Sequence, residues 1–134
     1  MNEEKVQEKY IEMKTLEEQM KHMQEQAATL EQQLMETMTI KKSLDDFKKA
    51  QKGDEILVPI SQGIFAKAEL KENKEFLVNV GANTIVNKDI ESTKKLMDKQ
   101  IEEMQGVHSK AMMQLQQWAL KAASIEKELK ELSK

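Results

Sequence analysis

The sequence contains no cysteine, one proline and four glycines among its 134 residues. Without cysteine, the chain has no disulfide framework, no catalytic thiol and no cysteine-ligated zinc site. Aromatic residues make up only 4% of the chain, so few large side chains are present to fill a compact core. Together these shortages favour long helices over a loop-rich globular fold.

Arginine is also absent, because all 21 basic residues are lysines. Arginine is the preferred side chain for reading guanine and for gripping phosphate with two parallel hydrogen bonds. Its absence and the net charge of −3 argue against nucleic acid as a partner. No apolar run approaches the ~20 residues that cross a bilayer, and no signal-peptide pattern follows the first residues. We therefore expect no membrane partner and a cytoplasmic location.

Residues 3–52 repeat their apolar side chains with the seven-residue period of a coiled coil. The predicted seam consists of Val6, Lys9, Met13, Leu16, Met20, Met23, Ala27, Leu30 and Leu34. Beyond Leu34, the next seam positions of the heptad are occupied by Thr37 and Lys41. Because apolar residues continue at Met38 and Ile40, we expect the buried face of the helix to rotate there.

Residues 89–133 carry a second heptad pattern, and Asp89 is a suitable N-cap for that helix. Its seam consists of Ile90, Lys94, Met97, Ile101, Met104, His108, Ala111, Leu115, Trp118, Ala122, Ile125, Leu129 and Leu132. Gly106 interrupts this helix at a cost of ~1 kcal/mol relative to alanine, and we expect it to mark a bend.

Residues 54–88 change to the alternating pattern of β-strands. The expected strands are 56–60, 64–70, 76–80 and 84–87, which form two successive hairpins. Pro59 cannot donate a hydrogen bond to a neighbouring strand, so it belongs at an edge or a bulge.

The two helices have matching lengths and can fold back as an antiparallel pair, with Met20 beside Trp118 and Ala27 beside Ala111. We therefore predict a mainly helical α+β fold in which a long antiparallel two-helix coiled coil has two β-hairpins inserted between its helices. Residues 1–134 would form one domain. Hairpins of this length cannot bury enough surface to be stable alone, and they leave open edges. We expect an oligomer that assembles through the sheet.

Methionine occurs ten times, and its flexible, polarizable side chain suits irregular apolar surfaces. Within the helices we expect the methionines to be seam residues. At the helix ends, which fray, two interpretations stay open: a plain seam, or an apolar surface offered to an unfolded protein. The residues at these ends are Val6, Tyr10, Ile11, Met13, Ile125, Leu129 and Leu132.

No combination of residues indicates catalysis. His22 and His108 lie too far apart in the antiparallel pairing to share a metal, and His108 is expected to be a polar seam residue. Asp45 and Asp46 point in different directions on a helix and are expected to face solvent. No phosphate-binding loop and no nucleophile motif occur. We expect no enzymatic activity, no cofactor and no metal.

Three segments are more specific than the heptads, and they occur in order between the two long helices. They are residues 56–60 (ILVPI), 65–70 (FAKAEL) and 78–83 (VNVGAN). In this order they resemble the α-class subunit of prefoldin over essentially the whole chain. The family's β-class subunits carry a single hairpin. The sequence departs from the family at Ser61 and Gln62, where many relatives are richer in glycine, and at Asn83, where a third small residue is common.

The resemblance implies a hexamer of two α-class and four β-class subunits, whose hairpins join in an intersubunit double β-barrel. It also implies a chaperone that holds unfolded polypeptides without ATP and passes them to a group II chaperonin. By position, the assembly residues would be Ile56, Val58, Ile60, Phe65, Leu70, Phe76, Val78, Val80 and Ile85. The client-facing residues would be those at the helix ends given above. In outline, residues 3–52 and 89–133 would form the coiled coil and residues 54–88 the assembly hairpins.

Two alternatives remain. A nucleotide-exchange co-chaperone resembling GrpE also joins long helices to a small β domain, although there the β part follows the helices. A passive coiled-coil scaffold would need neither two hairpins nor a methionine-rich seam.

Overall fold

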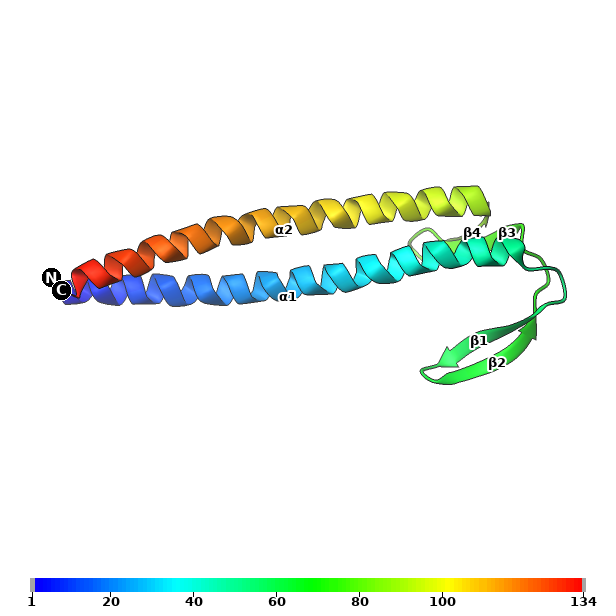
Figure 1. Ribbon diagram of the computed structural model, residues 1–134, viewed down its shortest axis with the longest axis horizontal. Helices are drawn as coiled ribbons and strands as arrows, with labels where there is room; N and C mark the ends of the chain where they lie inside the picture. The colour runs from blue at the N-terminus through cyan, green and yellow to red at the C-terminus, as the bar shows by residue number, and fades with distance from the viewer. Residues whose placement is uncertain (1, 134) are drawn as a thin grey trace. The chain divides into compact units, whose positions relative to one another are not determined.

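The computed structural model describes residues 2–133, which form two long helices with two β-hairpins between them (Figure 1). The elements in order are α1 (Asn2–Lys49), β1 (Glu55–Ser61), β2 (Ile64–Glu69), β3 (Glu75–Asn79), β4 (Ile85–Asp89) and α2 (Ile90–Leu132). This confirms the predicted fold class. In the described part of the chain, neither helix contains a stretch long and apolar enough to span a membrane.

The chain divides into two compact units. One comprises Met1–Met35 and Glu102–Lys134 and is called here the terminal unit. The other, Glu36–Ile101, is the hairpin unit, which contains the end of α1, both hairpins and the start of α2. Helix α2 continues through Gly106 without interruption.

The two helices meet along the predicted seam in each unit. The buried apolar residues of the terminal unit are Leu16, Ala27, Ala111, Leu115 and Ile125, and those of the helices in the hairpin unit are Leu44, Ile90 and Ile101. All except Leu44 belong to the predicted seam, and Leu44 lies on its continuation, two heptads after Leu30. Burial of a leucine or isoleucine side chain stabilises the pair by about 1.5–3 kcal/mol.

Ionisable side chains on the seam pair with the opposite helix. The pairs are Lys9–Glu128 and His108–Glu31 in the terminal unit, and Lys41–Asp98 and Lys94–Asp45 in the hairpin unit. Both pairs of the terminal unit have nitrogen-to-oxygen distances of 2.8 Å. From pair to pair, the residue number rises in α1 and falls in α2, as an antiparallel pairing requires. Asp45 is exposed, as predicted, and its carboxylate also accepts a hydrogen bond from Lys94.

The expected rotation of the buried face of α1 after Leu34 does not occur. In the hairpin unit, Met38 and Ile40 are 46% and 55% exposed, whereas Thr37 and Lys41 are half-buried. The ion pair between Lys41 and Asp98 lets a lysine occupy the seam, since its apolar stem packs there while its ammonium group reaches a carboxylate. The original heptad therefore continues as far as Leu44, and Met38 and Ile40 face outward. In the last turn of α1, Phe47 is half-buried and Lys48 is exposed, so the buried face shifts only there.

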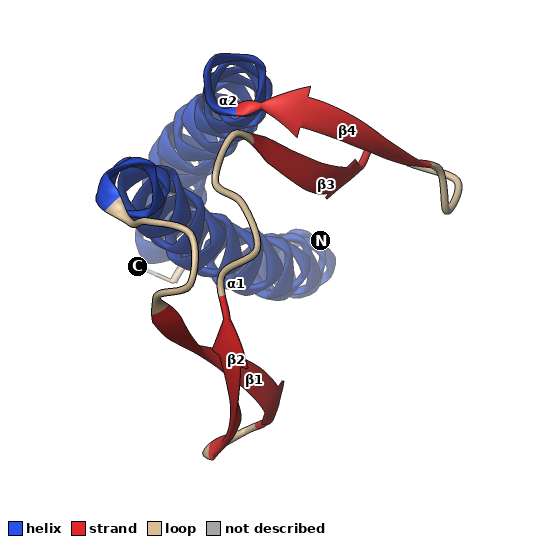
Figure 2. Ribbon diagram, turned by 90° about the vertical axis from the view of Figure 1, so that its right-hand side faces the viewer, coloured by secondary structure: helices blue, strands red, loops and turns tan. Residues whose placement is uncertain are grey.

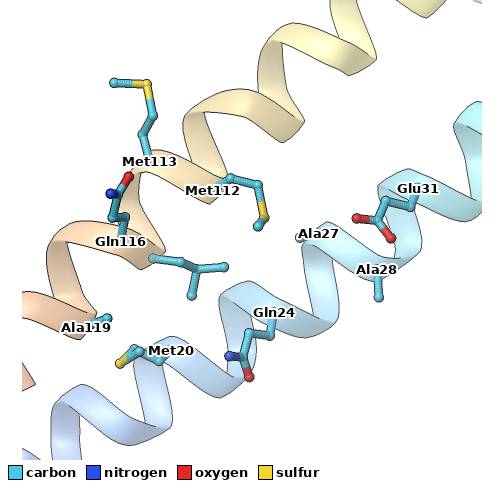
Figure 3. A pocket seen from close by; sticks show the side chains of 10 residues that line it. Met20, Gln24, Ala27, Ala28, Glu31, Met112, Met113, Gln116 and Ala119 are labelled. Carbon is cyan, nitrogen blue, oxygen red and sulfur yellow. The ribbon is translucent and has the colours of Figure 1, made fainter.

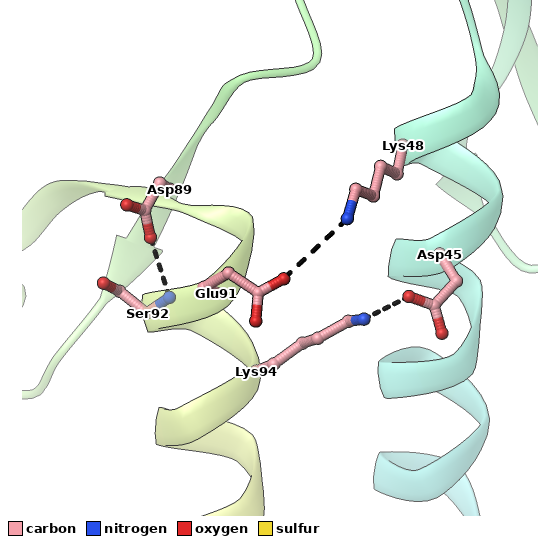
Figure 4. Close-up of polar contacts among 6 residues, drawn as sticks. All are labelled: Asp45, Lys48, Asp89, Glu91, Ser92 and Lys94. Carbon is pink, nitrogen blue, oxygen red and sulfur yellow. Dashed lines mark hydrogen bonds and ion pairs between the residues drawn. The ribbon is translucent and has the colours of Figure 1, made fainter.

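Polar contacts cap the first turn of α2 and join it to α1 (Figure 4). The backbone N–H of Ser92 donates a hydrogen bond to Asp89 Oδ1 at 2.7 Å, which confirms the predicted N-cap. This bond lowers the pKa of the Asp89 carboxyl group below its usual value. Glu91 lies 4.0 Å from Lys48 of α1, beside the hydrogen-bonded pair of Lys94 and Asp45.

The strands form two separate two-stranded antiparallel sheets, β1 with β2 and β3 with β4 (Figure 2). The pairing of β1 shifts between Pro59 and Ser61, which confirms a bulge or irregularity next to the proline. The fourth strand starts at Ile85 instead of Thr84, because the backbone N–H of Thr84 closes the turn by donating to the carbonyl of Gly81 at 2.9 Å.

This second turn holds two non-glycine residues in the left-handed region, with φ angles of 49° at Ala82 and 59° at Asn83. Positive φ at both central positions is the signature of a type I′ turn, whose twist matches that of a hairpin. Asparagine tolerates this conformation, whereas alanine does so at a cost of about 1–2 kcal/mol.

We expect Ala82→Gly to stabilise the β3–β4 hairpin by about 1 kcal/mol, because glycine adopts positive φ without steric strain. Amide hydrogen exchange at Val80, whose N–H donates to the carbonyl of Thr84, should slow about fivefold. The matched control is Ala68→Gly in strand β2, which should weaken its own hairpin. Faster exchange at Val80 in Ala82→Gly would contradict the turn geometry.

We expect the pair of Lys94 and Asp45 to make stability depend on pH. The hydrogen bond from Lys94 lowers the pKa of Asp45 from its ordinary 3.8, and the same bond raises the pKa of Lys94 above 10.5. The stabilisation is therefore present from above pH 3.8 up to pH 10.5, and it is lost as pH falls through the lowered pKa of Asp45 or rises through the raised pKa of Lys94.

Thermal unfolding followed by circular dichroism measures this effect. Asp45→Asn should lower the melting temperature at pH 7, and its difference from wild type should shrink as pH falls below 3.8. The control is Asp46→Asn at the exposed neighbouring position, for which little change is expected. If the melting temperatures of Asp45→Asn and wild type differed as much in acid as at pH 7, the pair of Lys94 and Asp45 would not be the cause of the difference.

Candidate protein-binding surfaces

The β1–β2 hairpin presents apolar side chains on both faces. Residues directly opposite each other share a face, so Val58 lies with Ala66 on one face while Pro59 lies with Phe65 on the other. Phe65 is 57% exposed and Val58 is 41% exposed. Neither face of this hairpin is therefore fully covered by the chain itself.

The β3–β4 hairpin has one face turned toward the helices. Phe76 and Val78 on this face are half-buried, and the ring of Phe76 meets the ring of Phe47 from α1 edge to face, with centroids 6.1 Å apart. The opposite face carries Leu77, which is 75% exposed, and Ile85. Neither Leu77 nor Ile85 is covered by the rest of the chain.

Asn73, in the connection between the hairpins, ties them to the end of α1. Its side-chain nitrogen Nδ2 donates to the backbone carbonyl of Ala50 at 2.6 Å and lies within 3.1 and 3.3 Å of those of Phe47 and Lys48. The last carbonyls of a helix have no partner within the helix, so this amide satisfies them. Gly53 and Leu70 add a backbone hydrogen bond of 2.8 Å between the chain entering β1 and the chain leaving β2.

The structure sorts the predicted assembly residues into two groups. Leu70 is buried and Ile56, Phe76 and Val78 are half-buried, so they pack within the chain, while Val58, Ile60, Phe65, Val80 and Ile85 are exposed. Three further exposed apolar residues are Leu57, Ile64 and Leu77. Only β1 is apolar at both alternate positions, whereas one face of β2 also carries Lys67 and Glu69, and the Leu77 face of β3 also carries Glu75 and Asn79.

The residues at the helix ends also divide by exposure. Tyr10 and Ile11 are 63% and 62% exposed, whereas Ile125 is 3% exposed and belongs to the seam. Val6, Tyr10 and Met13 of α1 line a groove of about 480 Å³ together with Leu129 of α2. Glu17, Glu126, Lys130 and Ser133 complete its lining. Leu132 lies in a neighbouring groove among charged residues. The client-facing role of these residues stays a prediction.

A larger groove of about 650 Å³ lies further along the terminal unit (Figure 3). Its lining from α1 is Met20, Gln24, Ala27, Ala28 and Glu31, and from α2 it is Met112, Met113, Leu115, Gln116 and Ala119. Three of these residues are alanines with small side chains, and three are flexible methionines. This arrangement suits contact with apolar groups of varied shape.

The histidines make ordinary contacts. The ring of His22 lies 3.2 Å from the amide nitrogen of Gln26 one turn along α1, and His108 contacts Glu31 across the seam at 2.8 Å. In residues 2–133, no three histidine, aspartate or glutamate side chains come together as metal ligands would.

The fold is therefore that of an antiparallel two-helix coiled coil with two β-hairpins between its helices. The family model described as "Prefoldin subunit" matches residues 16–134. The chain belongs to the prefoldin family, and it is therefore a chaperone subunit. The α-class resemblance predicted from the strand motifs is confirmed.

The relatives agree with this assignment. The chain is 28% identical over 131 residues to prefoldin subunit alpha of Methanococcus aeolicus, covering 98% of this chain and 88% of that protein. It is 26% identical over 128 residues to prefoldin subunit alpha of Archaeoglobus fulgidus, covering 96% and 93%. A chain in the cryo-EM structure of filamentous PFD from Methanocaldococcus jannaschii shares the fold with a TM-score of 0.57 and 18% identity, covering 93% of this chain and 98% of that one.

Proposed function

We propose that this chain is the α-class subunit of an oligomeric chaperone that holds unfolded polypeptides without ATP. The observation that carries the proposal is exposed apolar surface in both units: strand residues in the hairpin unit and grooves between the helices in the terminal unit. A chaperone of this kind needs one surface for its own subunits and another for unfolded clients.

The hairpins are the proposed assembly surface. Each of the four strands has a neighbour on one side only, so each leaves an open edge that a strand of another subunit can extend. Closing such edges between subunits gives a β-barrel, which removes them. The proposed assembly is a hexamer of two α-class and four β-class subunits, in which residues 54–88 join the barrel and residues 3–52 and 89–133 form the coiled coil of a single domain.

The grooves and exposed side chains at the helix ends are the proposed client surface. Tyr10 and Ile11 are exposed. Val6, Met13 and Leu129 line a groove in which a client segment could bind. Contacts of this kind are non-directional and need no defined client sequence. Family membership supports release of the held polypeptide to a group II chaperonin in the cytoplasm.

Leu77→Lys tests the assembly surface. The side chain of Leu77 is 75% exposed, so we expect the isolated chain to keep its helices, whereas burying an ammonium group in the assembly would cost several kcal/mol. The variant, mixed with β-class subunits, should elute as smaller species in size-exclusion chromatography with light scattering. Gln100→Lys, at an exposed position of α2 in the same unit, is the matched control and should assemble normally. A Leu77→Lys complex of normal mass would contradict the proposed barrel contact.

The double variant Tyr10→Ser/Ile11→Ser tests the client surface. We expect about tenfold weaker holding of chemically denatured citrate synthase, equal to ~1.4 kcal/mol, because two exposed apolar contacts are lost. Light scattering during dilution of the denatured protein measures the holding. The control Glu18→Ser/Gln19→Ser changes two exposed polar residues of the same helix and should hold normally.

Salt separates apolar from ionic binding in the same assay. Apolar holding should persist at 0.5 M sodium chloride, where exposed charges are screened beyond roughly 4 Å. Normal holding by Tyr10→Ser/Ile11→Ser would argue that the client surface lies elsewhere, and loss of holding in salt would show that charges bind the client.

A further inference from the structure

The described methionines fall into two groups. Those on the seam are half-buried: Met13, Met20, Met23, Met97 and Met104. Four others are exposed, with 70% of Met35, 46% of Met38, 47% of Met112 and 62% of Met113 accessible to solvent. Because the chain has no cysteine, methionine thioethers are its only sulfur groups. Any oxidation of sulfur in this protein therefore falls on methionine, and exposure decides which residue reacts first.

Two of the exposed methionines are neighbours on the large groove of the terminal unit. Met112 and Met113 line it together with Ala27, Ala28 and Ala119 (Figure 3). In that view the side chain of Met112 points across the groove toward α1, and that of Met113 points away from α1.

The groove is nearly free of charge. Residues 111–120 of α2 contain no ionisable side chain. Glu31 is the one ionisable residue of the lining, and its carboxylate already contacts His108 across the seam. The apolar character of the groove therefore depends on its alanines, Leu115 and the methionine thioethers.

We propose that Met112 and Met113 are an oxidation site through which peroxide changes this groove from apolar to polar. The thioether sulfur donates a lone pair to one oxygen of hydrogen peroxide, the S–O bond forms and the O–O bond breaks. The departing oxygen takes up the proton carried by the transferred oxygen and leaves as water. Each sulfur loses two electrons, the peroxide gains them, and the product is methionine sulfoxide.

This change leaves the helix pair intact. The neighbouring seam is held by Ala111 and Leu115, which are 7% and 9% exposed, and by the contact between Glu31 and His108. Met112 and Met113 lie outside this buried set, so a sulfoxide on either one adds a polar group at the surface and not in the core. The consequence for client holding rests on the proposed function, whereas the site of oxidation does not.

The site is tested on the assembled complex with limited hydrogen peroxide, followed by proteolysis and mass spectrometry of every methionine. Sulfoxide should form severalfold faster at Met112 and Met113 than at the seam residues Met20 and Met97. Circular dichroism should show unchanged helix content. Equal rates at the seam residues, protection of Met112 and Met113, or loss of helix would each overturn the proposal.

The consequence is tested with matched variants in the citrate synthase assay. Wild type should hold severalfold less denatured protein after oxidation, and Met112→Leu/Met113→Leu should be resistant. Met35→Leu removes a more exposed methionine that does not line the groove, so this variant should lose holding as wild type does. Methionine sulfoxide reductase with dithiothreitol should restore wild type, since two thiols become a disulfide and the sulfoxide oxygen leaves as water.

The outcomes separate the two proposals. If the unoxidised complex holds no citrate synthase, the proposed function fails, while the mass spectra still decide the oxidation site. A different result is that the unoxidised complex holds citrate synthase normally, while oxidation reduces holding by Met112→Leu/Met113→Leu as much as by wild type. In that case the groove does not mediate the effect of oxidation, and the inference fails while the proposed function stands.

Discussion

A two-stranded hairpin cannot cover its own two faces and two edges, and much of this structure follows from that constraint. Each hairpin uses one part of its surface to hold to the chain: Phe76 packs on Phe47, and Asn73 caps the end of α1. These contacts leave Leu77 and Phe65 exposed on faces that the chain itself does not cover. In the proposed assembly, strands of other subunits would cover these surfaces.

The helix pair meets a different requirement, which is a fixed register. An apolar seam rich in methionine tolerates slippage, because flexible side chains repack at little cost. Polar contacts of Lys9, Lys41, Lys94 and His108 across the seam specify the alignment, since a shift by one turn would separate each of these side chains from its carboxylate. Exposed pairs contribute little stability individually, so their role in the alignment is larger than their energy.

One residue type serves two purposes in this chain. Methionines on the seam pack between the helices, whereas Met112 and Met113 stand at the surface beside alanines and shape a groove. In the proposed function, the flexibility that lets methionine fill gaps in a seam would also let this surface adapt to clients of different sequence. Methionine also makes that surface chemically vulnerable, because a thioether is the one apolar side chain that a mild oxidant turns polar.

The sequence by itself determined the order helix, two hairpins, helix. It also determined the seam of α1 as far as Leu34, the seam of α2, the irregularity beside Pro59 and the Asp89 cap. Each of these features follows from a pattern of residues that are close in the sequence. Only the tertiary structure decided that Lys41 keeps its place on the seam while Met38 faces outward, since Asp98 lies far away in the sequence. The capping role of Asn73 and the division of the assembly residues into covered and exposed sets were hidden for the same reason. Periodicity reports which residues share a face, but the partner that satisfies a buried charge or an unpaired carbonyl is known only when the chain has folded.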